Sequence, residues 1–364
     1  MSYSIQDIFS FFKAVFISGF NLSFRQLFVL GRITSCRTAA LGAFIASCPD
    51  CGGTTRVFRS CSDRHCPVCS GARQREWAEA RMSDALPVPY FHIVFTIPAS
   101  LNALFLENQK VCYNLLFEAS AEALTSLCAS RKGLGFNPGF TSVLHTWGQT
   151  LQYHPHIHVM VPAGGLSEDG RRFIRSKGGF FIPAKVLSSV FRAVFLKKLK
   201  AGFSLERRLV DELYESAFVV NVEKPFKSPA NVIKYLARYV NKVAVSDSRI
   251  TGFDKRSGIV TFSYKDNRDG GKPKRMSMHA LEFMRRFFMH VLPKGFTKIR
   301  HYGFLALRSR RENMDLCFRL LGGDPPAPHT GRAPVSFNCP LCGKDAPFRT
   351  VSARELHVAR LKAS

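Results

Sequence analysis

The stretch that decides the fold is His154-Pro155-His156-Ile157-His158-Val159-Met160-Val161-Pro162, followed at once by Ala163-Gly164-Gly165. Side chains two apart on a β-strand point to the same face, so this stretch predicts a strand that presents His156 and His158 side by side. Neutral imidazole is a common metal ligand. The stretch therefore predicts a metal site on a β-sheet.

Two imidazoles rarely complete the coordination of a divalent ion, so we expect a third polar ligand from a neighbouring strand. The candidate is His92, which lies in the strand-like run Phe91 to Ile97. The alternatives are Gln149, Gln152 and His145. His154 precedes Pro155, which cannot donate to a strand ladder, so we place His154 either in the loop that enters the strand or among the residues that support the metal ligands from behind.

A second constellation is a pair of tyrosines on an expected helix that begins at Ser228-Pro229. Tyr235 and Tyr239 are four residues apart and share one face, which also carries Arg238 and Lys242. A basic face suits a phosphate, and tyrosine can attack one. The alternative is that both tyrosines only fill the edge of the core, which is a common position for tyrosine.

The charge of the chain indicates a polyanionic partner. Fifty-two Lys and Arg oppose 26 Asp and Glu, which gives a net charge of +26. Nucleic acid is favoured over a membrane surface, and Lys274 and Arg275 are candidate DNA contacts besides the basic residues of the tyrosine helix. The apolar segment from Ile8 to Ile17 is interrupted by Lys13. We interpret it as an amphipathic helix that packs on the body rather than on a membrane surface, and expect a cytoplasmic protein.

Eleven cysteines are grouped in a way that predicts zinc rather than disulfides. Cys48-x-x-Cys51 and Cys66-x-x-Cys69 have a spacing close to that of a zinc ribbon. These four thiols are the predicted structural Zn²⁺ ligands. Cys61 and His65 lie between the two pairs, and either could replace one of the four.

Cys339-x-x-Cys342 near the C-terminus is half of a second zinc knuckle. Its candidate partners are Cys317, His329 and His357, and the alternative is a plain turn with two free thiols. We predict that Cys36, Cys112 and Cys128, which have apolar neighbours, are core residues.

The chain has 364 residues, of which 46% are hydrophobic, so it can bury a sizeable core. Several expected hairpins, with helices between them, predict an α+β fold built on an antiparallel sheet with flanking helices, preceded by a small zinc-ribbon-like module. We divide it into four parts: an N-terminal helical segment (1–45), a zinc-binding module (46–85), a main domain (86–310) and a C-terminal basic tail with the second knuckle (311–364).

The order of zinc module, His-hydrophobe-His motif and paired tyrosines resembles the two-tyrosine HUH transposases of rolling-circle insertion sequences, which carry an N-terminal transposase zinc-binding domain. The likeness extends over most of the chain. The segments that carry it are Cys36-Arg37-Thr38-Ala39-Ala40-Leu41-Gly42, Arg64-His65-Cys66-Pro67-x-Cys69, Phe91 to Pro98, His154 to His158, Tyr235-Leu236-Ala237-Arg238-Tyr239, His290 to Phe296 and Ile299 to Gly303. The sequence departs from the family at Ala43-Phe44, where a Gly-His is usual.

The resemblance implies that residues 86–310 form an HUH nuclease domain acting on single-stranded DNA at element ends and at a target. His156 and His158 would hold Mg²⁺ or Mn²⁺ against the scissile phosphate. Tyr235 and Tyr239 would alternate as nucleophiles through a 5′-phosphotyrosine link, which conserves the phosphodiester energy. The implied process is DNA transposition.

Two other functions compete with this interpretation. One is a zinc-dependent DNA-binding protein without catalysis. The other is a histidine-triad nucleotide hydrolase, since His154, His156 and His158 also alternate. Pro155, the zinc motif, the net charge and the tyrosine pair all count against the hydrolase.

Overall fold

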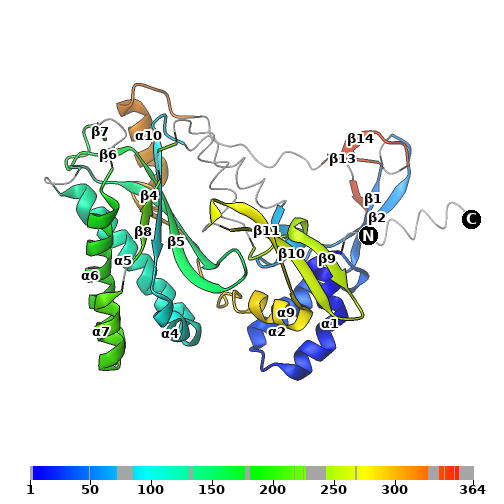
Figure 1. The fold of residues 1–364 in the computed structure, drawn as a ribbon. Helices are drawn as coiled ribbons and strands as arrows, with labels where there is room; N and C mark the ends of the chain where they lie inside the picture. Colours follow the sequence, from blue (N-terminus) through cyan, green and yellow to red (C-terminus); the bar gives the residue numbers. More distant parts are fainter. Residues whose placement is uncertain are drawn as a thin grey trace, which may run out of the picture.

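The structure, a computed structural model, describes most of the chain, namely residues 3–48, 50–71, 85–130, 134–176, 181–216, 218–223, 225–226, 243–266, 269–326, 336–339, 341–347 and 349–351. The predicted tyrosine helix, with Tyr235, Arg238, Tyr239 and Lys242, lies outside the described residues. Figure 1 shows two lobes and a small ribbon beside the second lobe. We call them the sheet lobe, the N-terminal lobe and the ribbon.

The sheet lobe is built on five antiparallel strands in the order β12-β4-β5-β3-β8, which confirms the predicted fold class. Their bounds are β3 (Tyr90–Thr96), β4 (Gly139–Trp147), β5 (Tyr153–Pro162), β8 (Val220–Val222) and β12 (Ile299–Gly303). The histidine stretch forms β5, at the centre of the sheet. The strand predicted from Phe91 onward is β3, which pairs with β5.

The strand that carries the histidines begins earlier than predicted. His154 lies within β5, so its expected place in an entry loop is wrong. Between the pairs His145–His156 and Trp147–Tyr153, one residue of β4 faces two residues of β5. This is a bulge, and it allows Pro155 to lie in the strand without an N–H to donate.

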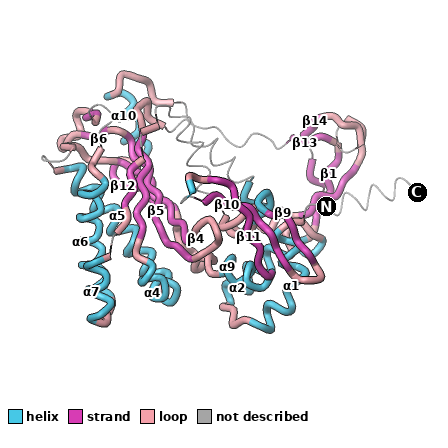
Figure 2. The backbone as a smooth tube through the Cα atoms, in the orientation of Figure 1, coloured by secondary structure: helices cyan, strands magenta, loops and turns pink. Residues whose placement is uncertain are grey.

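Helices cover one face of the sheet, as Figure 2 shows. The helical elements of this face are η2 (Ala99–Leu101), α4 (Asn102–Glu107), α5 (Gln109–Ala129), α6 (Ala184–Gly202) and α7 (Arg207–Glu215). The helix α10 (Arg310–Leu320) shares a separate core with Met160 of β5. Ile157, Val159 and Val161 of β5 are buried in the same core as α5 and α6. Because side chains alternate along a strand, His156 and His158 lie on the opposite face. The short hairpin of β6 (Gly164–Leu166) and β7 (Phe173–Arg175) follows β5 in this lobe.

The N-terminal lobe combines the first helices with a hairpin sheet from late in the chain. Its elements are α1 (Ile5–Gly19), α2 (Phe24–Thr34), η3 (Asp247–Arg249), β9 (Ile250–Asp254), β10 (Ile259–Asp266), β11 (Lys272–His279) and α9 (Ala280–Phe288). Phe9 of α1 packs against the rings of Phe283, Phe287 and Phe288. The N-terminal apolar segment therefore packs in a protein core, as predicted, and this core draws on both sides of the predicted boundary at residue 85.

The ribbon brings an early segment of the chain, residues 39–58, together with a late one, residues 336–351. Its elements are η1 (Ala39–Leu41), β1 (Ala43–Ser47), β2 (Thr54–Phe58), β13 (Ser336–Asn338), β14 (Asp345–Pro347) and β15 (Arg349–Val351). β1 pairs with β2 on one side and with β15 on the other, and β13 pairs with β14. Figure 1 shows β13 and β14 next to β1 and β2.

A buried histidine, His290, joins the two lobes just after α9. Its Nε2–H donates to the Leu151 carbonyl at 3.2 Å, and the Thr146 hydroxyl, also 3.2 Å away, donates to Nδ1. With the Thr146 hydroxyl as the donor to Nδ1, the ring is neutral. Burial lowers the pKa of His290 to about 4.

We expect His290 to destabilise the fold in mild acid. The unfolded state takes up a proton near pH 6.5 while the folded state does not, so stability falls as the pH drops from about 6.5 toward 4. Between pH 7 and pH 5 this residue should cost about 2 kcal/mol of unfolding free energy. Urea unfolding of the wild type and of His290→Gln at both pH values measures it. The variant should lose less stability than the wild type, and an equal loss would contradict the assignment.

Candidate functional site

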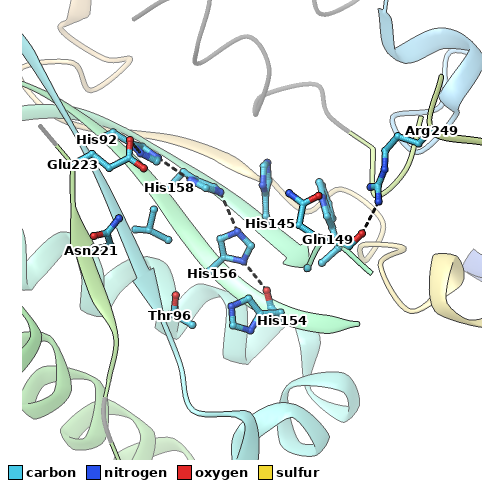
Figure 3. Close-up of a pocket in the computed structure, with 13 residues that line it drawn as sticks. His92, Thr96, His145, Gln149, His154, His156, His158, Asn221, Glu223 and Arg249 are labelled. Carbon is cyan, nitrogen blue, oxygen red and sulfur yellow. Dashed lines mark hydrogen bonds and ion pairs between the residues drawn. The ribbon is translucent and has the colours of Figure 1, made fainter. Parts of the chain in front are cut away.

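The histidine face of the sheet forms an open pocket of about 350 Å³. β3, β4, β5 and β8 supply most of its walls, and Arg249 reaches it from the N-terminal lobe (Figure 3). The polar and charged residues that line it are His92, Thr96, His145, Gln149, His154, His156, His158, Asn221, Glu223 and Arg249.

The two histidines of the motif face each other at the centre of the pocket. The Nε2 atoms of His156 and His158 are 3.0 Å apart. His156 Nδ1–H donates to the His154 carbonyl at 2.7 Å, so Nε2 of a neutral His156 ring carries a lone pair. His154 thus takes part through its backbone rather than its ring.

His158 is oriented from behind by a histidine and a carboxylate. Glu223 Oε2 lies 3.0 Å from His92 Nδ1, and His92 Nε2 lies 2.9 Å from His158 Nδ1 (Figure 3). A carboxylate accepts from Nδ1–H, so a neutral His92 accepts at Nε2 from the Nδ1–H of His158. This leaves a lone pair on Nε2 of His158, directed at that of His156. Two nitrogens about 2.1 Å from one ion, at a right angle to each other, would lie about 3.0 Å apart.

The third imidazole of the group is His145 of β4. It offers a ring nitrogen within 4.8 Å of those of His156 and His158. The expectation that His92 is the third ligand is corrected, because the Nε2 of its ring is engaged with His158 and Nδ1 with Glu223. Of the alternatives, Gln149 lines the pocket and Gln152 accepts a hydrogen bond from Thr150 N–H at 3.2 Å.

Two charged residues of the pocket were missed by the sequence reasoning. Glu223 follows β8, a strand of three residues with too short a pattern to predict. Arg249 donates from Nη2 to the Gln149 carbonyl at 2.5 Å and from Nε to the Ser263 carbonyl at 2.7 Å. Burial lowers the pKa of this guanidinium. Arg249 lines the pocket because the two lobes pack together, which the sequence pattern does not reveal.

The predicted zinc ligands are divided between two clusters. Cys66 and Cys69 gather with Cys61 and Cys36, all four of them buried, with Sγ–Sγ distances of 3.5 Å for Cys36–Cys69 and 3.7 Å for Cys61–Cys69. The prediction that Cys48 and Cys51 share an ion with Cys66 and Cys69 is therefore wrong. Cys36 is a member of this cluster and not only a core residue, because the turn after α2 carries it to Cys61.

Cys48 and Cys51 lie elsewhere, at the tip of the β1–β2 hairpin, where they meet Cys339 and Cys342. The partners proposed for the C-terminal pair are corrected accordingly. Cys317 belongs to α10 and is buried in the core against which this helix packs, and His329 and His357 lie outside the described residues.

His65 is not placed to bind zinc. Its Nδ1–H donates to Asp63 Oδ1 at 2.8 Å, and its Nε2 accepts from the Leu292 N–H at 3.1 Å. Arg64 donates to the carbonyls of Phe296 and Pro293. These two residues dock the first cysteine cluster onto the loop after α9, and both nitrogens of the His65 ring are engaged in doing so.

The predicted DNA contacts differ in their surroundings. Lys274 pairs with Asp266 at 2.8 Å and Asp269 at 3.2 Å, so acidic neighbours offset its charge. Arg275, the next residue of β11, is exposed. Arg238 and Lys242 lie outside the described residues.

Comparison with known proteins supports both the histidine site and the N-terminal cysteine cluster. Residues 139–313 match a family described as "Putative transposase", and residues 8–97 match the "Transposase zinc-binding domain". The "Putative transposase y4qJ" of Sinorhizobium fredii is 41% identical over 334 residues, which cover 87% of this chain and 83% of that protein. The chain belongs to the two-tyrosine transposase family.

A more distant member is the "Transposase for insertion sequence element IS801" of Pseudomonas savastanoi pv. phaseolicola. It is 27% identical over 335 residues, covering 86% of this chain and 80% of that protein. No solved structure matches the transposase at a significant level. Within the described residues, none of the helices has both the length and the apolar character needed to cross a membrane.

The two family matches cover different sets of candidate site residues. The segment 139–313 contains His145, His156 and His158 together with the two tyrosines. The zinc-binding segment 8–97 contains the first cysteine cluster and the pair Cys48 and Cys51. Cys339 and Cys342 lie beyond both segments.

Proposed function

We propose that this transposase cleaves and rejoins single-stranded DNA at the ends of its element through a 5′-phosphotyrosine intermediate. The observation that carries the proposal is the pair of facing Nε2 atoms of His156 and His158, held 3.0 Å apart with the opposite ring nitrogens engaged as donors. Such an arrangement favours a cation between the rings. The enzyme would act on the nucleoid in the bacterial cytoplasm.

The donor set fits a divalent metal ion. His145, His156 and His158 offer three nitrogens within one 4.8 Å group. Mg²⁺ prefers oxygen ligands, so among the two expected ions Mn²⁺ suits three imidazoles better. A bound ion would polarise the phosphoryl oxygens and offset the charge that develops on them.

The remaining chemistry belongs to side chains of the transposase. The hydroxyl of Tyr235 or Tyr239 would lose its proton, and its oxygen would form a bond to phosphorus as the bond to the 3′ oxygen breaks. The 3′ oxygen would take up a proton, so the departing strand would end in a free 3′-hydroxyl. The phosphodiester energy is retained in the tyrosine ester, so rejoining needs no ATP. Arg249, at the rim of the pocket, is placed to attract the phosphate backbone. A second tyrosine would permit another cleavage while the first adduct persists.

The assay for this function uses labelled single-stranded oligonucleotides that tile both ends of the element, with Mn²⁺ or Mg²⁺. We expect a denaturant-stable protein–DNA adduct on one strand at each end, formed faster with Mn²⁺. DNA binding without an adduct on any strand would contradict the proposal and favour a zinc-dependent binding protein.

We expect the Glu223–His92 pair to position His158 rather than to bind the ion. Glu223→Gln removes the negative charge that holds the Nδ1 proton of His92, so the Mn²⁺ concentration giving half-maximal adduct formation should rise about 10- to 100-fold. The maximal rate at saturating Mn²⁺ should change much less. A metal titration of adduct formation measures both quantities, with Glu212→Gln on the exposed face of α7 as the control. An unchanged midpoint for Glu223→Gln would contradict the positioning role.

A further inference from the structure

The second cysteine cluster, formed by Cys48, Cys51, Cys339 and Cys342, joins an early and a late segment of the chain. Cys48 and Cys51 lie between β1 and β2, whereas Cys339 and Cys342 lie between β13 and β14. We propose that these four cysteines bind a second structural Zn²⁺, which joins the β1–β2 hairpin to the β13–β14 hairpin as a zinc ribbon. The proposal is independent of the catalytic function.

The distances fit a tetrahedral thiolate site. Cys48 Sγ lies 3.9 Å from Cys342 Sγ, and Cys51 Sγ lies 3.8 Å from Cys339 Sγ. All four sulfur atoms lie within 4.8 Å of one another. Four thiolates at a Zn–S distance of about 2.3 Å in a tetrahedron would be about 3.8 Å apart. Disulfide sulfurs would be about 2.05 Å apart, which is far shorter than these separations.

The two halves of the site are copies of one local structure. The sequences are Cys48-Pro49-Asp50-Cys51-Gly52 and Cys339-Pro340-Leu341-Cys342-Gly343. In each copy the glycine N–H donates to the carbonyl of the first cysteine, at 3.0 Å for Gly52 and 2.8 Å for Gly343. Both glycines have a positive φ, 66° and 72°, which suits glycine in a tight turn. Each turn holds two thiols on one side, as a zinc knuckle requires.

The two knuckles also touch without any ion. A Cβ placed on Gly53 would lie 2.3 Å from Leu341 Cδ1 and 3.1 Å from Cys51 Sγ, so the Leu341 side chain occupies that space. In the same region β15 pairs with β1, with Ala46 opposite Thr350. Backbone pairing and side-chain packing therefore bring the C-terminal hairpin to the same place as the thiols.

The count of ligands also favours two ions. The first cluster already contains four cysteines, Cys36, Cys61, Cys66 and Cys69. Structural zinc sites are closed with four ligands, so that cluster has no need of the Cys48–Cys51 pair. Among the described residues, Cys339 and Cys342 are the thiols that complete the second set. The ion would then link cysteines that are 288 and 294 residues apart in the sequence.

The test is the zinc content of the full-length transposase, purified under reducing conditions and dialysed against metal-free buffer. We expect two zinc ions per chain in the wild type and one in Cys339→Ser, Cys342→Ser. The control Cys112→Ala, Cys128→Ala removes two buried thiols outside both clusters and should retain two ions. Circular dichroism and the remaining zinc ion would show that the ribbon variant is folded.

A conservative exchange separates loss of a ligand from loss of folding. Cys342 is exposed, and histidine replaces cysteine in many zinc sites, so Cys342→His should retain two ions while Cys342→Ala should retain about one. A wild type with a single zinc ion, or a Cys339→Ser, Cys342→Ser variant that still holds two, would overturn the proposal. Either result leaves the DNA cleavage assay unaffected, so the two proposals fail separately.

Discussion

Replacing His156 with alanine should lower the rate of DNA cleavage by about 10³-fold, because a metal ion contributes several kcal/mol to stabilising a phosphoryl transition state and each 1.4 kcal/mol is about tenfold in rate. His156 supplies one of the two facing Nε2 atoms, which lie 3.0 Å apart, so its removal takes away one of the nitrogens that would hold the ion. The loss should appear as slower adduct formation in single-turnover assays at saturating Mn²⁺.

His154→Ala is the matched control for this prediction. His154 belongs to the same strand and lines the same pocket, but it holds His156 through its carbonyl oxygen, which alanine retains. We expect adduct formation within a few-fold of the wild type. Equal losses in His154→Ala and His156→Ala would contradict the arrangement, since a histidine triad would need all three rings.

The second large effect is expected for the double variant Tyr235→Phe, Tyr239→Phe. Phenylalanine keeps the ring but removes the nucleophilic oxygen, so the covalent adduct should disappear, with a rate loss of at least about 10³-fold. Binding of single-stranded DNA should stay within a few-fold, because the basic surface is unchanged. Gel analysis under denaturing conditions measures the adduct, and a filter assay measures binding.

Each single tyrosine variant serves as the control for the double one. If the tyrosines alternate, Tyr235→Phe and Tyr239→Phe should each retain one cleavage step but lose complete strand transfer. Cleavage at the wild-type rate in the double variant would exclude tyrosine as the nucleophile. It would favour the histidine-triad chemistry, in which a histidine receives the phosphoryl group.

Much of the sheet lobe could be predicted from local patterns. The alternation around His156 and His158 predicted the strand that became β5, and the apolar run from Phe91 predicted its neighbour β3. Period-two alternation survives folding because one face is buried and the other carries the site. The bulge opposite Pro155 was missed, since it depends on the register with β4.

The ligand sets could not be predicted, because they depend on contacts between distant parts of the chain. His92 and His145 both lie on strands next to β5, and only the pairing shows that His92 lies behind His158 with Glu223. Spacing grouped Cys48 with Cys66, but the β1–β2 hairpin carries Cys48 away to the C-terminal knuckle. The spacing of cysteines and histidines in the sequence therefore does not determine which of them share a metal site.

The central claim is tested most directly by identifying the residue that carries DNA in the adduct. The adduct formed in the presence of Mn²⁺ with an oligonucleotide from the element end would be digested with protease and nuclease. The modified peptide would then be sequenced by mass spectrometry. We predict a nucleotide joined through its 5′-phosphate to Tyr235 or Tyr239. A phosphoryl group on a histidine of the 154–158 stretch, or on any other residue, would contradict the proposed mechanism.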